Sequence, residues 1–303
     1  MSIQRNTITF GAIGLLTIGA LILEGCQKES LPINDVGSEG SSSIGETKMV
    51  GGTTMFALTA QGGVSDLYSV TTAGVYTYLA TIKGPGSTDV DHFKGITWDP
   101  VNNCTWLVTN NTATVSAHKN MLWQIPGPLP LIPVGILNAT PVAALTITGG
   151  AAVLDAMDVE YDAATGTIFL LRNTPAGTFP KFATLSVIGG TAGRVTNLSG
   201  TPPNVQGFTI SCNKKLIALK TVTVPPQLIE LSRITGAPTG LSVAFSTPAF
   251  TAPDGGIEPM PACLSNDLFA ANAFVGTLGF ASRLGTPYLT NPTIRNTLDM
   301  TTM

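Results

Sequence analysis

Charged side chains are scarce in this sequence of 303 residues. Asp, Glu, Lys and Arg make up 11% of it, whereas a typical soluble domain has roughly 25%. The net charge of −3 gives no basic surface of the kind that nucleic-acid binding needs. It is also too small to indicate a disordered acidic chain. Thr, Asn, Ser and Gly must therefore supply most of the polar surface.

Residues and motifs for catalysis are scarce as well. The chain has two His, His92 and His118, whereas a zinc site needs three or four ligands, and no His-x-x-x-His or Cys-x-x-Cys spacing occurs. A Gly-x-Ser-x-Gly elbow and a phosphate-binding loop are missing. No feature marks one Ser as the nucleophile of a Ser-His-Asp triad. These absences favour a non-catalytic protein, and they leave an enzyme open as the alternative.

Helical periodicity is missing after the first 25 residues, and short runs that alternate between apolar and polar residues take its place. Such runs, bounded by Gly, Pro and Asn, are typical of β-strands. The clearest is a hairpin at residues 95–110, with a tight turn from Asp99 to Asn103. Similar hairpins follow at residues 158–171, 207–219 and 260–271. Their recurrence after roughly 50–60 residues indicates a repeat architecture.

The repeats predict an all-β protein, a β-propeller of about five four-stranded blades over residues 55–303. The first unit lacks its opening strand, and we expect residues 294–300 to supply it and close the ring. The Pro-rich residues 126–141 are predicted to form a long loop or an irregular strand. Another number of blades and a two-sheet sandwich are the alternatives, but a sandwich does not predict a recurring hairpin.

The N-terminus has the pattern of an export signal. Residues 8–23 are almost wholly apolar, a little short for a membrane span of about 20 residues, and they lie where a secretory signal would. The sequence Leu23-Glu24-Gly25-Cys26 then resembles a bacterial lipobox, although Glu24 departs from that pattern. The resemblance implies that residues 1–25 are a signal peptide and that Cys26 is lipidated. An uncleaved N-terminal anchor is the alternative.

The residues that follow Cys26 suggest a location for the protein in the cell. Gln27-Lys28-Glu29-Ser30 resembles the short tag of surface-exported lipoproteins of the Bacteroidota, and a random polar start to a linker is the alternative. Residues 26–54 continue rich in Ser and Gly, a composition typical of a flexible tether. The resemblance implies a lipid-anchored protein of the outer membrane, on the cell surface, with the membrane and an outer-membrane protein complex as partners.

A candidate ligand site follows from the predicted fold. In a propeller, the segment that leads into each innermost strand lies near one mouth of the central channel, where polar groups from different blades converge. Those segments carry Asp91, His92, Lys94, Asp155, Asp158, Gln206 and Glu258. We expect them to bind a glycan, a peptide or a neighbouring surface protein, and the carboxylates would also suit Ca²⁺. Ordinary solvated loop residues are the alternative.

Aromatic rings form a second candidate site. Exposed rings among Tyr68, Tyr76, Tyr78, Trp106 and Trp123 would stack on sugars. Rings in strands belong more often to the core, and we expect that role for most of them.

With Cys26 lipidated, Cys104, Cys212 and Cys263 remain, and an odd number cannot all pair within one chain. We interpret them as small buried residues beside equivalent turns.

Three functions are compatible with these features. The first is a non-catalytic binding or scaffold lipoprotein. The second is a metal-dependent propeller enzyme, such as a hydrolase, lyase or lactonase-like protein, acting at the channel mouth. The third is a structural component of the surface layer. Fold alone cannot choose among them, because propellers host many functions.

Overall fold

The computed structural model describes residues 54–61, 64–71, 75–90, 93–110, 113, 115–147, 155–173, 181–188, 192–202, 204–220, 227–244, 257–259, 268–272, 277–281, 287–292 and 297–303. The predicted signal peptide, Cys26 and the tether lie outside these ranges. Within them, no helix has the length and hydrophobicity needed to cross a membrane.

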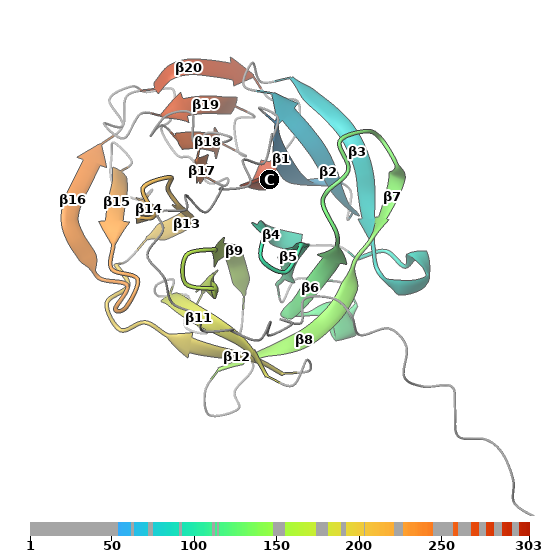
Figure 1. Ribbon diagram of the computed structural model, residues 1–303, viewed down its shortest axis with the longest axis horizontal. Coiled ribbons are helices and arrows are strands. Elements are labelled where there is room, and N and C mark those ends of the chain that lie inside the picture. Colours follow the sequence, from blue (N-terminus) through green and yellow to red (C-terminus); the bar gives the residue numbers. More distant parts are fainter. Residues whose placement is uncertain are drawn as a thin grey trace, which may run out of the picture.

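The strands form five blades around a central axis (Figure 1). Blade 1 contains β21 (Thr297–Thr302), β1 (Thr54–Gln61), β2 (Val64–Thr71) and β3 (Tyr76–Lys83). Blade 2 contains β4 (Phe93–Asp99), β5 (Cys104–Thr109), β6 (Met121–Pro126) and β8 (Thr140–Ile147). Blade 3 contains β9 (Ala156–Asp162), β10 (Thr167–Arg172), β11 (Lys181–Ile188) and β12 (Ala192–Asn197). Blade 4 contains β13 (Val205–Ile210), β14 (Leu216–Lys220), β15 (Gln227–Leu231) and β16 (Pro238–Ala244). Blade 5 contains β17 (Ile257–Pro259), β18 (Leu268–Asn272), β19 (Thr277–Ala281) and β20 (Pro287–Pro292).

The predicted propeller is thus confirmed, and the two-sheet sandwich is excluded. Two short 3₁₀ turns, η1 (Pro85–Ser87) and η2 (Ser116–His118), lie in the connections.

The C-terminal strand closes the ring. The innermost strand of blade 1 is β21, and it pairs with β1 in antiparallel register from Met55 opposite Thr302 to Thr59 opposite Thr297. This confirms the prediction that the C-terminus supplies the strand that the first unit lacks. The pairing covers an inner edge of β1 that would otherwise offer unpaired backbone groups.

The Pro-rich residues 126–141 do more than the sequence predicted. Residues 127–139, here called the strap, leave blade 2 and cross to blade 1. There β7 (Gly135–Asn138) pairs in parallel with β3. The backbone N–H groups of Val134 and Ala139 donate to Leu79 O at 2.8 Å and Lys83 O at 2.7 Å. Blades 2 and 3 are joined in a similar way, because β8 pairs in parallel with β12.

The core lies between neighbouring blades. Three buried apolar clusters fill the spaces between blades 1 and 2, 2 and 3, and 3 and 4. Trp123 packs edge-on against Phe93, with ring centroids 5.7 Å apart. Tyr68, Trp106 and Trp123 are buried, so the prediction that rings belong to the core is confirmed for them, whereas Tyr78 is exposed.

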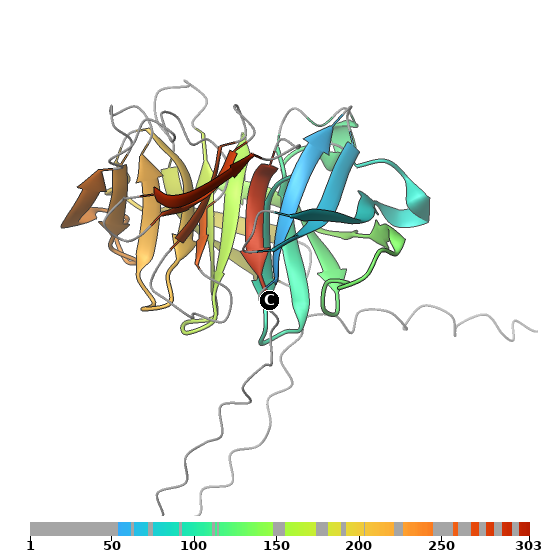
Figure 2. The same cartoon turned by 90° about the horizontal axis from the view of Figure 1, so that it is seen from above.

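The innermost strands run in the same direction and give the ring two different faces. Gly95 of β4 lies against Asp158 and Val159 of β9, and a Cβ on this glycine would come within 2.6 Å of the Val159 backbone N. Thr97 lies beside Tyr161, whose backbone N–H donates to the Thr97 hydroxyl oxygen at 3.0 Å. The C-terminus and the inner hairpin turns therefore share one face, here called the lower face, and the inner strands begin at the upper face (Figure 2).

Candidate functional site

Four of the five innermost strands carry a β-bulge near the upper face. Each ladder skips one residue of the inner strand: Lys94 in β4, Met157 in β9, Gln206 in β13 and Leu298 in β21. A bulge leaves one residue out of the pairing and redirects its side chain. The same irregularity therefore recurs around the axis at one height.

Three of the bulged residues, Lys94, Met157 and Gln206, have solvent access where the residues on either side of them are buried. Lys94 and Met157 are half-buried in strands whose other residues are all buried, and Gln206 is half-buried between two buried residues. Two of the predicted site residues, Lys94 and Gln206, thus occupy equivalent positions. Met157 was not predicted, although the alignment of Lys94-Gly95, Met157-Asp158 and Gln206-Gly207 in successive repeats contained the signal. We take this group as the candidate site.

Asp155 holds blades 2 and 3 together at the upper face. Its carboxylate accepts hydrogen bonds from Asn110 Nδ2 at 3.3 Å and Asn173 Nδ2 at 2.8 Å. Its backbone N–H donates to Asn120 Oδ1 at 3.1 Å. Asp155 has a positive φ of 62°, which an Asp tolerates better than most residues. Asp155 lies directly before β9, as the sequence predicted, and its carboxylate is engaged by the protein itself.

Asp158 is buried between blades 3 and 4. One carboxylate oxygen accepts the N–H of Val159 at 2.8 Å, and the other accepts the N–H of Phe208, in the inner strand of blade 4, at 2.9 Å. Glu160, two residues further along β9, makes a similar contact with blade 4, because its Oε1 accepts the Thr209 hydroxyl at 3.2 Å. A buried carboxylate needs such donors, because burying it unpaired would cost far more than the hydrogen bonds return. These acids join neighbouring blades.

The other predicted site residues are only partly described. Asp91 and His92 lie outside the described residues. Glu258 belongs to β17, the innermost strand of blade 5, but its side chain lies outside the described part. It follows the buried Ile257 as Gln206 follows the buried Val205, but it is paired with Phe269 in its ladder and forms no bulge.

Arg172 is a buried cation near the upper face that sequence reasoning missed. It ends β10 with 3% of its surface exposed. Its Nε donates to Asn197 Oδ1 and its Nη1 to Asn173 O, both at 3.0 Å. Burial lowers the pKa of Arg172. Its position at the end of an apolar strand, Thr167 to Leu171, gave no sign of these contacts.

The recurring hairpins have a structural explanation at the lower face, where their turns lie. Asp99 ends β4, and its carboxylate accepts the N–H groups of Val101 and Asn102, both at 3.0 Å, and Trp106 Nε1 at 3.0 Å. Asp162 ends β9 and caps its own turn through Ala164 N at 3.1 Å. An Asp that bonds the backbone two residues ahead stabilises a tight turn. The recurring sequence pattern is therefore explained by the formation of tight turns.

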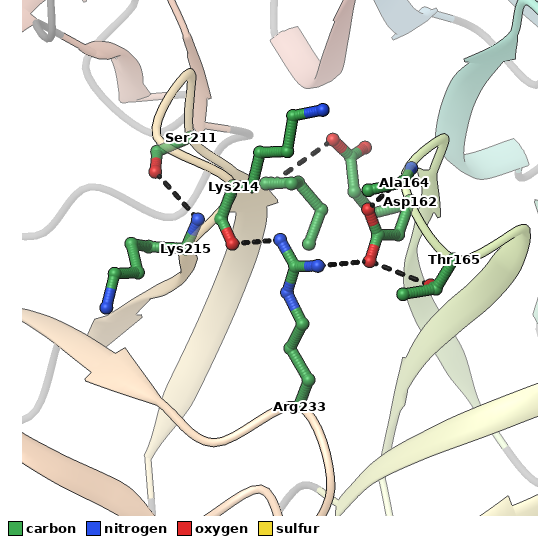
Figure 3. Close-up of polar contacts among 9 residues, drawn as sticks. Asp162, Ala164, Thr165, Ser211, Lys214, Lys215 and Arg233 are labelled. Carbon is green, nitrogen blue, oxygen red and sulfur yellow. Dashed lines mark hydrogen bonds and ion pairs between the residues drawn. The ribbon is translucent and has the colours of Figure 1, made fainter. Parts of the chain in front are cut away.

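The same two Asp residues also interact with a side chain of the next blade. The Tyr161 hydroxyl of blade 3 donates to Asp99 of blade 2. Burial, followed by the charge and hydrogen bond of Asp99, raises the pKa of Tyr161 to about 12. Arg233 of blade 4 pairs with Asp162 of blade 3 at 2.5 Å and also donates to Lys214 O (Figure 3).

Cys104 is buried, as interpreted, and Cys212 is half-buried, but packing alone does not describe either of them. Cys104 and Cys212 are both disulfide-bonded, and no free cysteine occurs among the described residues. Cys26 and Cys263 lie outside the described ranges. A disulfide constrains the unfolded chain and so adds stability, which explains two cysteines at turns better than packing alone.

The described residues contain no group of three or more His, Cys, Asp or Glu side chains that could hold a metal ion. His118, the described His, packs edge-on against Trp123 with ring centroids 5.1 Å apart. The predicted calcium site would therefore need groups beyond the described carboxylates.

No protein-family model matches this sequence, and no curated protein matches it. Among solved structures, a nidogen/laminin complex contains a chain that is 11% identical, with a TM-score of 0.45, over 81% of this chain and 82% of that one. A gluconolactonase from Xanthomonas campestris is 12% identical, with a TM-score of 0.46, over 80% and 79%. A calcium-binding protein, regucalcin, from Agrobacterium tumefaciens is 12% identical, with a TM-score of 0.40, over 81% and 76%. Likeness this distant carries no argument about activity.

Proposed function

We propose that this protein is a non-catalytic binding or scaffold lipoprotein, anchored to the outer membrane and exposed at the cell surface. Its ligand, a glycan, a peptide or a neighbouring surface protein, binds at the upper end of the axis. The anchor is supported by the apolar residues 8–23 followed by Leu23-Glu24-Gly25-Cys26. The ligand site is supported by the bulged residues.

The observation that carries this proposal is the repeated bulge. Three blades have a half-buried side chain at the same position, and the three differ in chemistry: the cation Lys94, the amide Gln206 and the thioether Met157, which also packs against the core between blades 3 and 4. Convergent groups of mixed chemistry suit recognition of a ligand that offers both polar and apolar surface. Asp155 and Asp158 support the site indirectly, because they fix the strands that carry the bulges.

Replacement of the bulged side chains tests the ligand site. The probes are a glycan array and solubilised outer membranes, from which wild-type protein captures a ligand or a partner. Lys94→Ala combined with Gln206→Ala should weaken that capture about tenfold or more, because the lost polar contacts are worth roughly 1 kcal/mol each. Lys119→Ala is the control, since Lys119 lies in the connection before β6 and belongs to no bulge. Equal capture by all three proteins would contradict the proposal.

The anchor has its own test. Cys26→Ala should abolish labelling of the protein by radioactive palmitate. The variant should also be found in the soluble fraction, whereas the wild-type protein should be extracted from membranes by detergent. Labelling that persists in this variant would show that Cys26 is not the lipidated residue.

A metal-dependent enzyme is the competing function, with calcium as its ion. It needs carboxylates other than Asp158, whose two oxygens already accept backbone N–H groups. Calcium titration by calorimetry, followed by hydrolysis assays with and without a chelator, separates the two functions. Saturable calcium binding together with turnover that a chelator abolishes would favour the enzyme.

A further inference from the structure

Two cations lie directly opposite each other at the upper end of blade 3. Arg172 ends β10 and Lys181 begins β11, and the two are registered partners in the antiparallel ladder. Side chains in such a pair lie on the same side of the sheet with Cβ atoms roughly 5 Å apart, and like charges in this position are destabilising. The corresponding pair in blade 4 combines Lys220 with the neutral Gln227. Two cations at this position therefore need an explanation.

The guanidinium of Arg172 is buried without a carboxylate partner. Arg172 is 3% exposed, and its contacts are neutral, since Nε donates to Asn197 Oδ1 and Nη1 to Asn173 O. In the part of the chain that the structure describes, no hydrogen-bond acceptor contacts Nη2. Buried charges are normally paired and hydrogen-bonded, and a guanidinium offers more N–H donors than these two contacts use. Arg172 therefore has donors left for a further acceptor.

Acidic residues do not offset the two cations. No Asp or Glu occurs in residues 100–154 or in residues 163–229. These ranges supply the connections that follow β5, β8, β10 and β12, apart from Asp155 itself. Asn173 separates Asp155 from the guanidinium, because Asn173 Nδ2 donates to the Asp155 carboxylate at 2.8 Å while Asn173 O accepts from Nη1. The group thus holds two positive charges and one negative charge.

The two cations adjoin the candidate site and can be reached from solvent. Arg172 is opposite Ala156, which directly precedes the bulged Met157. Neighbouring strands lie about 5 Å apart, and Arg172 and Lys181 are one and two strands further from the axis than this bulge. Asn197 is exposed and Lys181 is half-buried. A ligand bound at the bulged residues would therefore reach the two cations with a group on its outer side.

We propose that Arg172 and Lys181 bind an oxyanion, a carboxylate or a phosphate, that is carried by the ligand at the upper end of the axis. The remaining N–H groups of the guanidinium donate to the oxygens of this anion, and their planar arrangement suits both groups. The ammonium of Lys181 adds a compact positive charge. The bound anion offsets the repulsion between the cations. This inference rests on the proposed function and deepens it, because it gives the ligand an acidic group.

Titration with inorganic phosphate tests the site, with the arginine Nε–H signals in NMR spectra as the readout. The protein is the chain from residue 27, which includes every described strand, and Arg172→Lys identifies the signal of Arg172. We expect that signal to shift and to saturate at millimolar phosphate. Lys181→Ala should weaken binding about tenfold or more, since a charge-assisted contact is lost. Lys181→Glu should abolish binding, because it supplies a carboxylate opposite the guanidinium.

Lys214→Glu is the matched control, because it makes the same change of charge at an exposed lysine of the lower face and should leave phosphate binding unchanged. Lys181→Glu should also melt at a higher temperature than Lys214→Glu, since it pairs a buried cation. Circular dichroism checks that each variant is folded. An Arg172 signal that does not respond to phosphate, or equal binding by the wild-type protein and Lys181→Glu, would overturn the anion site.

Galacturonate in place of phosphate distinguishes the two kinds of oxyanion, with galactose as the uncharged control. Saturable binding of galacturonate without binding of galactose would assign the site to a carboxylate as well, whereas a response to phosphate alone would assign it to a phosphate. Failure of this site is distinct from failure of the proposed function. If Lys94→Ala with Gln206→Ala weakens ligand capture while phosphate leaves Arg172 unchanged, the binding function stands and the anion site falls. The converse result keeps the anion site and removes the axial one.

Discussion

Single side chains in this ring link one blade to the next. Asp158 accepts the backbone N–H of Phe208, Asp99 accepts the Tyr161 hydroxyl, and Asp162 pairs with Arg233. Each contact spans two blades that share no inner-strand ladder. Asp158, which the sequence analysis assigned to a ligand site, thus contributes to the stability of the ring.

Tyr161 should make stability depend on pH in the alkaline range. Its pKa rises from 10.0 to about 12 in the folded protein, so its contribution is complete below pH 10 and is lost as pH rises through 12. Tyr161 should make the free energy of unfolding fall by at most about 1.4 kcal/mol per pH unit in this range. Urea unfolding at several pH values from 9 to about 12 should show a shallower decline in Tyr161→Phe. Tyr78→Phe, at an exposed ring, is the control, and identical slopes in all three proteins would contradict this assignment.

The turns after the inner strands form the next level of organisation. Asp99 has no exposed surface and, besides the Tyr161 hydroxyl, its carboxylate accepts hydrogen bonds from Val101 N, Asn102 N, Asn102 Nδ2 and Trp106 Nε1. Removing such an acceptor leaves buried donors unsatisfied. One residue therefore secures both the turn and the tryptophan behind it.

Asp99→Ala should lower the free energy of unfolding by about 2–3 kcal/mol, since the buried Trp106 N–H loses its acceptor together with the turn. Asp89→Ala removes the same side chain where it is 66% exposed and paired with Lys83, and this change should cost at most about 0.5 kcal/mol. Urea denaturation of both variants measures the difference. Equal destabilisation would show that the turn does not depend on its Asp.

The elements differ in how far the sequence predicted them. The recurring hairpins and the closing strand β21 were predictable, because Asp99 and Asp162 repeat in a local turn pattern and the first repeat lacked an opening strand that the C-terminus could supply. The pairing of β7 was not predictable, because its partner β3 lies more than 50 residues earlier in the chain. The Pro-rich residues around β7 also interrupt the alternation of apolar and polar residues that marks a strand. Lys94 and Gln206 were grouped from their place in the repeat, and they occupy equivalent bulges. The roles of Asp155 and Asp158 depend on which neighbouring backbone they meet, which no local pattern encodes.

The whole molecule depends on closure between its two ends. The ladder of β21 with β1 has five registered pairs, and β21 also packs against β4 of the next blade. Without β21, the inner edge of β1 would face the axis with unsatisfied backbone groups. Closure therefore couples the stability of blade 1 to that of blade 2.

Deletion of residues 297–303 should lower the melting temperature by at least about 10 °C, because a ladder worth several kcal/mol is lost. The exposed edge of β1 should also make the shortened chain associate as its concentration rises. Differential scanning calorimetry and size-exclusion chromatography measure the two effects. Deletion of Met303 alone keeps the ladder and serves as the control. A shortened chain that is monomeric and equally stable would contradict the role of the closing strand.

The position of β1 has a mechanical consequence. A pull on the N-terminus acts along β1, which is held on both edges, by eight registered pairs to β2 and five to β21. Both partners are antiparallel to β1 and lie alongside it, so the load is a shear that strains many hydrogen bonds together, whereas unzipping would break them one after another. Force applied to the N-terminus would therefore load this fold in a direction in which many hydrogen bonds share the strain.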